Sequence, residues 1–237
     1  MRFLFLCLSV WVAAGASVLR PPTTKLVSAM PAASPAIPYL ALGDSYTIGE
    51  GAAHADRWPV QLAALAHAHG VPLAAPEIIA KTGWTTAELQ EAIAASGNHR
   101  HDYGLVSLLI GVNNQYRGQS QDLYRAEFRQ LLATAQAYAG GQAGRIFVLS
   151  IPDWGQTPFA EKEDRAPAQI AHEIDQFNAV AQAECQAAGV AFVDITDLTR
   201  AAAGDAHQFT DDGLHYTGPQ MRQWAARALP VVQGLLQ

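Results

Sequence analysis

From residue 39 to the C-terminus, short apolar runs alternate with longer segments of helical character. The short runs predict buried strands at 39–42, 77–80, 105–110, 145–150 and 190–195. The longer segments predict helices at 58–69, 86–95, 121–139, 168–188 and 219–236. Strands that alternate with helices of this length indicate a parallel sheet with both faces covered. The pattern therefore predicts an α/β domain, a three-layer α/β/α sandwich with a five-stranded parallel sheet.

Residues with catalytic chemistry stand at two places in this pattern. The first predicted strand ends at Gly43, and Ser45 follows closely, so a serine hydroxyl lies where open α/β sheets bind their ligands. Near the C-terminus, Asp212 stands three residues before His215, so that one loop can present both. Taken singly, these motifs also occur in ordinary turns and surface loops. Together they supply a nucleophile, a base and a group that orients the base.

The order of the motifs resembles that of the SGNH, or GDSL-type, hydrolases. Residues 43–45, Gly-Asp-Ser, look like the first family block, with Tyr46 in place of the usual leucine. Gly83 is similar to the glycine of the second block. Residues 111–114 look like the third block, Gly-x-Asn-Asp, with Asn114 in place of the aspartate. The aspartate and histidine near the C-terminus fit the last block.

This resemblance covers the whole predicted domain and implies the flavodoxin-like fold of that family. It implies that Ser45 is the nucleophile, that His215 is the base and that Asp212 orients the histidine. It also implies an oxyanion hole formed by the backbone N–H groups of Ser45 and Gly83 and by the Asn113 side-chain amide, which meet the negative charge of the reaction. We expect neither a metal nor a cofactor at this site.

These residues predict a serine esterase that hydrolyses carboxylic esters. A carbohydrate deacetylase or an acyltransferase would use the same residues on another substrate or acceptor. A catalytically silent binding module is the alternative from a different class, and the presence of every triad member argues against it. The formal charge of −6 and the lack of any run of Lys or Arg argue against nucleic acid as a partner. The expected substrate is a small-molecule, glycan or lipid ester.

The N-terminus has the pattern of a secretory signal peptide. Arg2 precedes an apolar stretch, residues 3–14, and small residues follow it, which predicts a signal peptide at 1–16 with cleavage after Ala16. An uncleaved membrane anchor is the alternative, because the largely apolar stretch reaches the lower limit of about 17 residues for spanning a bilayer. The position of the small residues favours cleavage, and we expect no stable membrane insertion of the mature chain.

The remaining domain boundaries follow from composition. Residues 17–38 are rich in proline and predict a tether, which leaves the hydrolase domain at 39–237. With the signal removed, Cys185 is the only cysteine, so an internal disulfide is excluded. A signal peptide without an internal disulfide is compatible with a periplasmic or secreted protein.

Five aromatic residues that follow strand ends or motifs are candidates to line an acyl or leaving-group pocket, and some of them are expected to be packing residues. They are Trp84, Tyr116, Trp154, Phe159 and Tyr216. The longest loop after a strand spans only 152–167, and no long apolar lid is evident. We therefore expect a preference for esters of short acyl groups. The pairs His67/His69 and His99/His101 do not share a helix face, so we expect solvated side chains rather than a metal site.

Overall fold

Five parallel strands form one sheet in the order β2-β1-β3-β4-β5. The strands are β1 (Tyr39–Gly43), β2 (Glu77–Ala80), β3 (Leu105–Leu109), β4 (Ile146–Leu149) and β5 (Ala191–Val193). This is the flavodoxin-like order, in which β1 and β3 are neighbours although β2 separates them in sequence. Such a switch point is where doubly wound sheets place their ligand site.

The computed structural model describes residues 9–11, 15 and 35–237. The contacts divide the chain into two units, Met1–Ala33 and Ser34–Gln237, and the fold is that of the second. The predicted cleavage site after Ala16 and most of the predicted tether lie outside the described residues. Within the described part of the chain, no helix is both long enough and apolar enough to cross a membrane.

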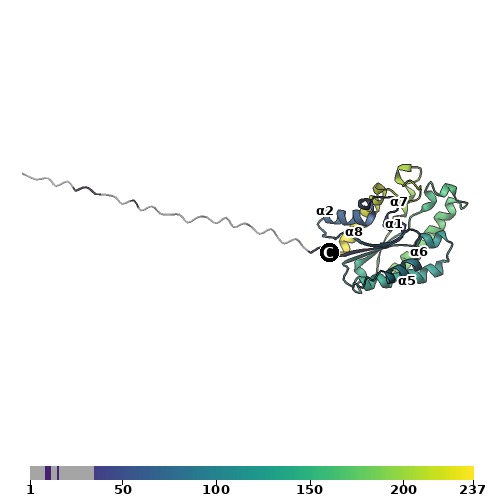
Figure 1. Cartoon of the computed structure of the whole chain (residues 1–237), viewed down its shortest axis with the longest axis horizontal. Helices are drawn as coiled ribbons and strands as arrows, with labels where there is room; N and C mark the ends of the chain where they lie inside the picture. The colour runs from purple at the N-terminus through teal and green to yellow at the C-terminus, as the bar shows by residue number, and fades with distance from the viewer. Residues whose placement is uncertain (1–8, 12–14, 16–34) are drawn as a thin grey trace, which may run out of the picture. The chain divides into compact units, whose positions relative to one another are not determined.

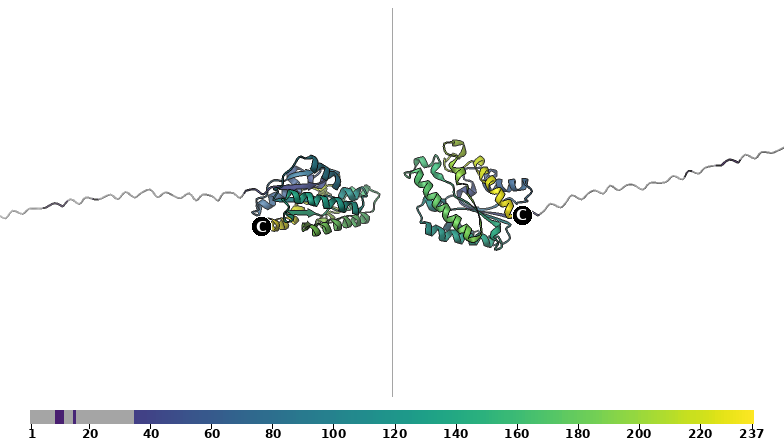
Figure 2. Two further views of the ribbon diagram at one scale, coloured as in Figure 1. Left: turned by 90° about the horizontal axis from the view of Figure 1, so that it is seen from below. Right: turned by 180° about the vertical axis from the view of Figure 1, so that it is seen from behind.

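Helices cover both faces of the sheet (Figures 1 and 2). Helix α2 packs on α8 on one face, whereas α5 packs on α3 and α6 on the other. The α-helices are α1 (Ser45–Ile48), α2 (Trp58–Ala68), α3 (Thr86–Ala95), α4 (Val112–Tyr116), α5 (Gln121–Tyr138), α6 (Pro167–Ala188), α7 (Thr196–Arg200) and α8 (Gly218–Leu235). Short 3₁₀ helices are η1 (His54–Asp56), η2 (Ala143–Arg145), η3 (Trp154–Gln156), η4 (Ala160–Lys162) and η5 (Ala206–Gln208).

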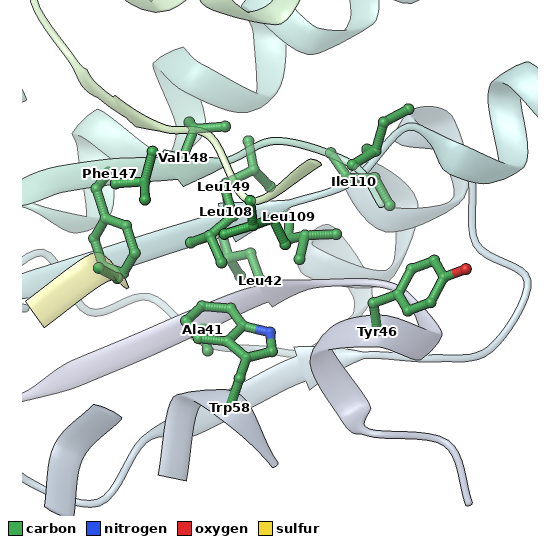
Figure 3. Packing of buried hydrophobic residues seen from close by; sticks show 14 of the residues in the cluster. Ala41, Leu42, Tyr46, Trp58, Leu108, Leu109, Ile110, Phe147, Val148 and Leu149 are labelled. Carbon is green, nitrogen blue, oxygen red and sulfur yellow. The ribbon is translucent and has the colours of Figure 1, made fainter. Parts of the chain in front are cut away.

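The core follows from the apolar strand runs. Every residue of β1, β3 and β4 is buried, as expected for strands covered on both faces. Trp58 at the start of α2 packs beneath β1, and its ring lies 6.2 Å from that of Phe147 in β4 (Figure 3). Tyr46 lies beyond the end of β1, with its hydroxyl directed away from this cluster (Figure 3). The core therefore fixes the strand ends from which the functional residues project.

All five predicted strands and all five predicted long helices are present, and the predicted three-layer fold is confirmed. The boundaries agree to within about two residues. Three helices were not expected: α1, α4 and α7 have only four or five residues. Segments of this length complete little more than one turn, so they carry no readable hydrophobic period.

Backbone hydrogen bonds join residues just before the predicted boundary at residue 39 to the domain. Ile37 forms a parallel bridge with Leu73, its N–H donates to Pro72 O at 2.7 Å and its carbonyl accepts from Ala74. The carbonyl of Pro38 accepts from two backbone N–H groups at the start of β3. The last two residues of the predicted tether are therefore held against the domain by backbone hydrogen bonds.

Candidate active site

The strand register brings three motif blocks to one edge of the sheet. Gly43 at the end of β1 pairs with Ala80 of β2 on one side and with Leu109 of β3 on the other. Ser45, Gly83 and Asn113 each follow one of these three strand ends by a few residues. Because parallel strands end at the same edge, residues separated by up to 68 positions become neighbours.

These residues surround a cavity of about 180 Å³. Its lining is Ser45, Tyr46, Thr82, Gly83, Val112, Asn113, Tyr116, Trp154, Phe159, Leu214 and His215. Four of the five predicted site residues are in this set. The fifth, Asp212, lies outside the cavity lining, bonded to the His215 ring. The walls are mostly apolar, and the polar groups come from the motif residues and Thr82.

The segment 43–48, here called the serine turn, is buried at nearly every position. Asp44 caps α1 by accepting a hydrogen bond from the Tyr46 N–H at 3.0 Å, and Ser45 is the first helical residue. The first N–H groups of a helix have no partner within the helix, so the Ser45 N–H is available to a ligand. Gly49 ends α1 with a φ of +67°, a left-handed conformation that favours glycine.

Asp44 is fully buried, and its environment disfavours the ionised form of its carboxyl. Its Oδ2 and the nearby Thr47 Oγ1 have no hydrogen-bond partner among the described residues. Burial raises the pKa of the Asp44 carboxyl to about 7, although the hydrogen bond from the Tyr46 N–H favours the charged form. The serine turn therefore holds a carboxyl that is protonated below neutral pH.

The segment 210–216, here called the histidine loop, is held by hydrogen bonds to one carboxylate. Asp212 Oδ1 accepts from Thr210 Oγ1 at 2.9 Å and from the backbone N–H groups of Leu214 at 2.8 Å and His215 at 3.0 Å. Its Oδ2 contacts His215 Nδ1 at 2.6 Å. Gly213 lies between Asp212 and His215 in the sequence and has a φ of +70°, which lets the chain turn back toward the carboxylate.

The charge on Asp212 fixes the histidine tautomer. Partial burial opposes ionisation of this carboxyl, but the bonds from the His215 side chain and from two backbone N–H groups outweigh it and lower the pKa of Asp212 to about 2. An ionised carboxylate can only accept, so His215 Nδ1 carries the hydrogen and donates it. When His215 is neutral, its Nε2 is left as an acceptor of a proton.

Two further donors face the cavity from neighbouring loops. Gly83 has a φ of +86°, and its carbonyl accepts from Arg117 Nη2 at 2.6 Å, which fixes the peptide unit between Gly83 and Trp84. Asn113 Nδ2 donates to the Trp84 carbonyl at 2.9 Å. An amide nitrogen carries two hydrogens, so one remains available to a ligand. This bond also fixes the orientation of the Asn113 amide plane.

Asn114, the departure from the family pattern, supports the adjoining loop. Its side chain is fully buried, accepts from the Thr86 N–H at 3.1 Å and donates to Thr86 Oγ1 at 2.6 Å and Gln119 Oε1 at 2.7 Å. Thr86 Oγ1 commits its own hydrogen to Glu127 and so requires a donor at position 114. An amide meets this need, whereas an ionised carboxylate does not.

The aromatic candidates divide into two groups. Tyr116, Trp154 and Phe159 line the cavity. Tyr216 is fully buried beside Tyr46 and Trp224, and Trp84 packs against the core, so both are outside the cavity lining.

Four lining residues had not been expected: Tyr46, Thr82, Val112 and Leu214. Each is adjacent in sequence to a predicted site residue, which is the signal that could have found them.

The histidine pairs considered as metal ligands do not form a site. His67, His69, His99 and His101 are all exposed. Among residues 9–11, 15 and 35–237, no group of three or more His, Cys, Asp or Glu side chains could hold a metal ion. Cys185 is a free thiol buried in α6.

Comparisons with known proteins identify the family. The model of the GDSL-like Lipase/Acylhydrolase family matches residues 41–222. Among solved structures, TesA is 17% identical with a TM-score of 0.65, over 84% of this chain and 99% of TesA. The esterase EstA from Pseudoalteromonas sp. is 14% identical with a TM-score of 0.63, over 84% of this chain and 97% of EstA. Phospholipase A1 from Streptomyces albidoflavus is 20% identical with a TM-score of 0.59, over 84% of this chain and 99% of the phospholipase.

A search of curated protein sequences finds no match. The structural similarities, all at 20% identity or below, concern the fold, and the family model covers more than half of the chain. By that match the chain belongs to the GDSL-like lipase/acylhydrolase family and is an SGNH-type hydrolase.

Proposed function

We propose that this protein is a serine esterase that hydrolyses carboxylic esters through Ser45, His215 and Asp212. One observation carries the proposal: Ser45 and a histidine oriented by an ionised carboxylate line the same cavity as Gly83 and Asn113. A serine hydroxyl is a weak nucleophile until a base removes its proton. A histidine whose Nδ1 is committed to a carboxylate offers Nε2 as that base.

In the proposed reaction, Ser45 Oγ attacks the ester carbonyl while His215 Nε2 takes the hydroxyl proton. His215 then gives this proton to the leaving alcohol, and the acyl group remains on Ser45 as an ester. Water attacks this ester, again with His215 as base, and releases the acid and free Ser45. Asp212 stabilises the protonated imidazole in both steps.

The negative charge that forms on the carbonyl oxygen needs preorganised donors. We assign this role to the backbone N–H groups of Ser45 and Gly83 and to the free hydrogen of the Asn113 amide. The assignment is supported by the place of all three residues in the cavity lining and by the bond to the Trp84 carbonyl, which orients the Asn113 amide. Donors fixed before the reaction need no reorganisation as charge develops.

The test is hydrolysis of p-nitrophenyl butyrate by purified Ser45→Ala and His215→Ala variants. Each should lose nearly all activity while keeping the wild-type circular dichroism spectrum, because the triad members act as one unit. His99→Ala is the matched control, since His99 is exposed and outside the cavity, and it should retain wild-type rates. A folded Ser45→Ala variant with wild-type activity would overturn the proposal.

We further propose that the protein works in the periplasm or outside the cell. The proposal is supported by the sequence of the first 16 residues, with Arg2, an apolar stretch and small residues before the expected cleavage point. Mass spectrometry of the exported protein should find a chain that begins at Ser17. A full-length chain retained in the membrane would contradict it.

A further inference from the structure

One wall of the cavity is made of three aromatic rings from different segments. Tyr116 ends α4, Trp154 lies in η3 and Phe159 follows it in the loop before α6. Tyr116 and Trp154 pack edge to face with centroids 5.4 Å apart, and Phe159 lies 6.2 Å from Trp154 and 6.5 Å from Tyr116. Each ring therefore contacts both of the others, and the three form a continuous apolar wall.

The members of this wall differ in how firmly they are held. Trp154 is 1% exposed, and its indole N–H donates to Gln115 Oε1 at 2.8 Å. The Phe159 backbone N–H donates to the Gly213 carbonyl at 3.0 Å, which ties it to the histidine loop. Tyr116 is 41% exposed, so its place in the wall depends on the side chains that cover it.

Arg165 contacts both the exposed Tyr116 ring and the buried Trp154 ring. Its guanidinium carbon lies 5.0 Å from the Tyr116 ring centroid and 4.9 Å from that of Trp154. Its Nη2 donates to the Tyr116 carbonyl at 3.2 Å, and its Nη1 lies 3.7 Å from Glu173 of α6. The neighbouring Glu163 accepts from the Tyr116 hydroxyl at 3.2 Å. A planar guanidinium suits this combination of stacking and hydrogen bonding, which an ammonium group cannot reproduce.

The contacts have two consequences for what the cavity can hold. The cavity, with a volume of about 180 Å³, is compact, which suits an acyl group of a few carbons. The Arg165 guanidinium already makes cation–π contacts with two of the three rings, those of Tyr116 and Trp154. A positively charged acyl group placed against this wall would therefore be repelled by Arg165. In the proposed reaction the leaving alcohol lies beside His215, which protonates it. The acyl group then lies on the other side of the scissile bond, against the aromatic wall.

We propose that Arg165 is a specificity-determining residue that holds the wall of Tyr116, Trp154 and Phe159 closed and restricts the site to esters of short, neutral acyl groups. This inference rests on the proposed esterase function. It assigns to one residue outside the cavity lining a control over acyl length and acyl charge. If Arg165 is removed, the exposed Tyr116 ring is released and the cavity can extend along the loop before α6.

The first experiment compares p-nitrophenyl acetate, butyrate and octanoate, which share a leaving group. The wild-type kcat/KM should fall with chain length, and Arg165→Ala should raise the octanoate-to-acetate ratio by about tenfold, mainly through a lower KM for octanoate, because each newly buried CH₂ favours binding. Arg227→Ala is the matched control. It removes an equal charge on α8 that pairs with Asp197, away from the cavity, and should leave the ratio unchanged.

The second experiment separates charge from shape. It compares p-nitrophenyl 4-(trimethylammonio)butyrate with its neutral carbon isostere, p-nitrophenyl 5,5-dimethylhexanoate. The wild-type protein should prefer the neutral ester, and Arg165→Ala should reduce this preference. Arg165→Lys keeps the charge but loses the stacking plane, so it should keep the preference while its length profile shifts toward octanoate.

The inference fails if the folded Arg165 variants keep both the wild-type length ratio and the wild-type charge preference. An opposite shift, toward acetate, also overturns it. Failure of the esterase proposal gives a different result, since the wild-type protein would then hydrolyse none of these esters, or Ser45→Ala would hydrolyse them equally well.

Discussion

The serine turn and the histidine loop hold their functional side chains by different physical means. In the serine turn, residues 43–47 are buried, and two of their polar atoms have no partner among the described residues. In the histidine loop, the Asp212 side chain is 44% exposed, yet its two oxygens accept four hydrogen bonds. Packing fixes Ser45, whereas a bonded carboxylate fixes His215.

This difference has a chemical reason. The proposed nucleophile needs a fixed position at the end of β1, and close packing of small groups supplies it without polar partners that would compete for the hydroxyl. The proposed base needs a fixed tautomer and a stabilised charged form, which only a hydrogen-bonded anion supplies. Changes in volume should therefore damage the serine turn most, and changes in charge the histidine loop.

Among substitutions that change a charge, Asp212→Asn should cause the largest loss of activity. The amide has the same size but presents no charge to the imidazolium, so we expect kcat to fall by roughly 10²- to 10⁴-fold. The unfolding midpoint at neutral pH should also fall modestly, because the low pKa of Asp212 means that its ionised form stabilises the fold. Steady-state kinetics on p-nitrophenyl butyrate measures it. Asp211→Asn is the control, because the His215 ring is bonded to Asp212 and not to Asp211. Equal losses of kcat in the two variants would mean that activity depends on the negative charge of the loop and not on the hydrogen bond between Asp212 and His215.

Asn113 belongs to neither region and tests the proposed chemistry separately from the positioning of Ser45 and His215. Asn113→Ala should lower kcat by about 10²- to 10³-fold with a smaller change in KM, because the amide acts mainly on the developing charge. Asn113→Asp should be at least as damaging, since it places an acceptor where a donor is needed. A loss confined to KM would assign Asn113 to substrate binding instead.

Adding a methyl group at Gly43 tests whether close packing holds the serine turn. A Cβ here would lie 2.5 Å from the Leu109 carbonyl oxygen and would clash with Thr47 Oγ1. We expect Gly43→Ala to lower the free energy of unfolding by about 1 to 3 kcal/mol and to reduce activity by displacing Ser45. Urea unfolding measures the first effect. Gly234→Ala in α8, where a Cβ meets nothing within 4 Å, should be neutral or stabilising.

A Gly43→Ala variant with unchanged stability and activity would show that packing does not hold the serine turn.

The effect expected at Asp44, smaller than the losses in kcat, is a pH dependence of the free energy of unfolding. Because burial raises the pKa of this carboxyl to about 7 from an ordinary value of 3.8, its protonated form favours folding below pH 4, and that contribution is lost as pH rises to 7. Asp44→Asn should therefore be more stable than wild type at pH 8, by about 1 to 3 kcal/mol, and equal to it near pH 4. Urea unfolding at both pH values checks this. A constant difference would contradict it.

The elements that the sequence predicts well are those whose neighbours lie within the same segment. The strand at 39–42 and the helix at 121–139 carry a hydrophobic pattern over their own length, and both are present almost at the predicted limits. The helices α1 and α4 carry no such pattern. They form because Asp44 caps one and Gly111, with a φ of +131°, begins the other.

The site was predictable where a residue has unusual chemistry at a strand end, as Ser45 and Asn113 do, or in a short motif with a carboxylate, as His215 does. It was not predictable where the signal is three-dimensional. Arg165 is an ordinary loop arginine in the sequence, and its role follows only from two rings that stand 49 and 11 positions away. Likewise, the need for a donor at Asn114 follows from the hydroxyl of Thr86, which another element presents.

The proposed reaction depends most on Ser45 as the nucleophile that His215 activates. Reaction with a fluorophosphonate probe, followed by intact-protein mass and peptide mapping, tests this directly, because the probe forms a covalent bond only with an activated hydroxyl. We expect one adduct per chain, on Ser45, formed much more slowly in His215→Ala and absent in Ser45→Ala. An adduct on another residue, or equal labelling of wild type and Ser45→Ala, would contradict the account.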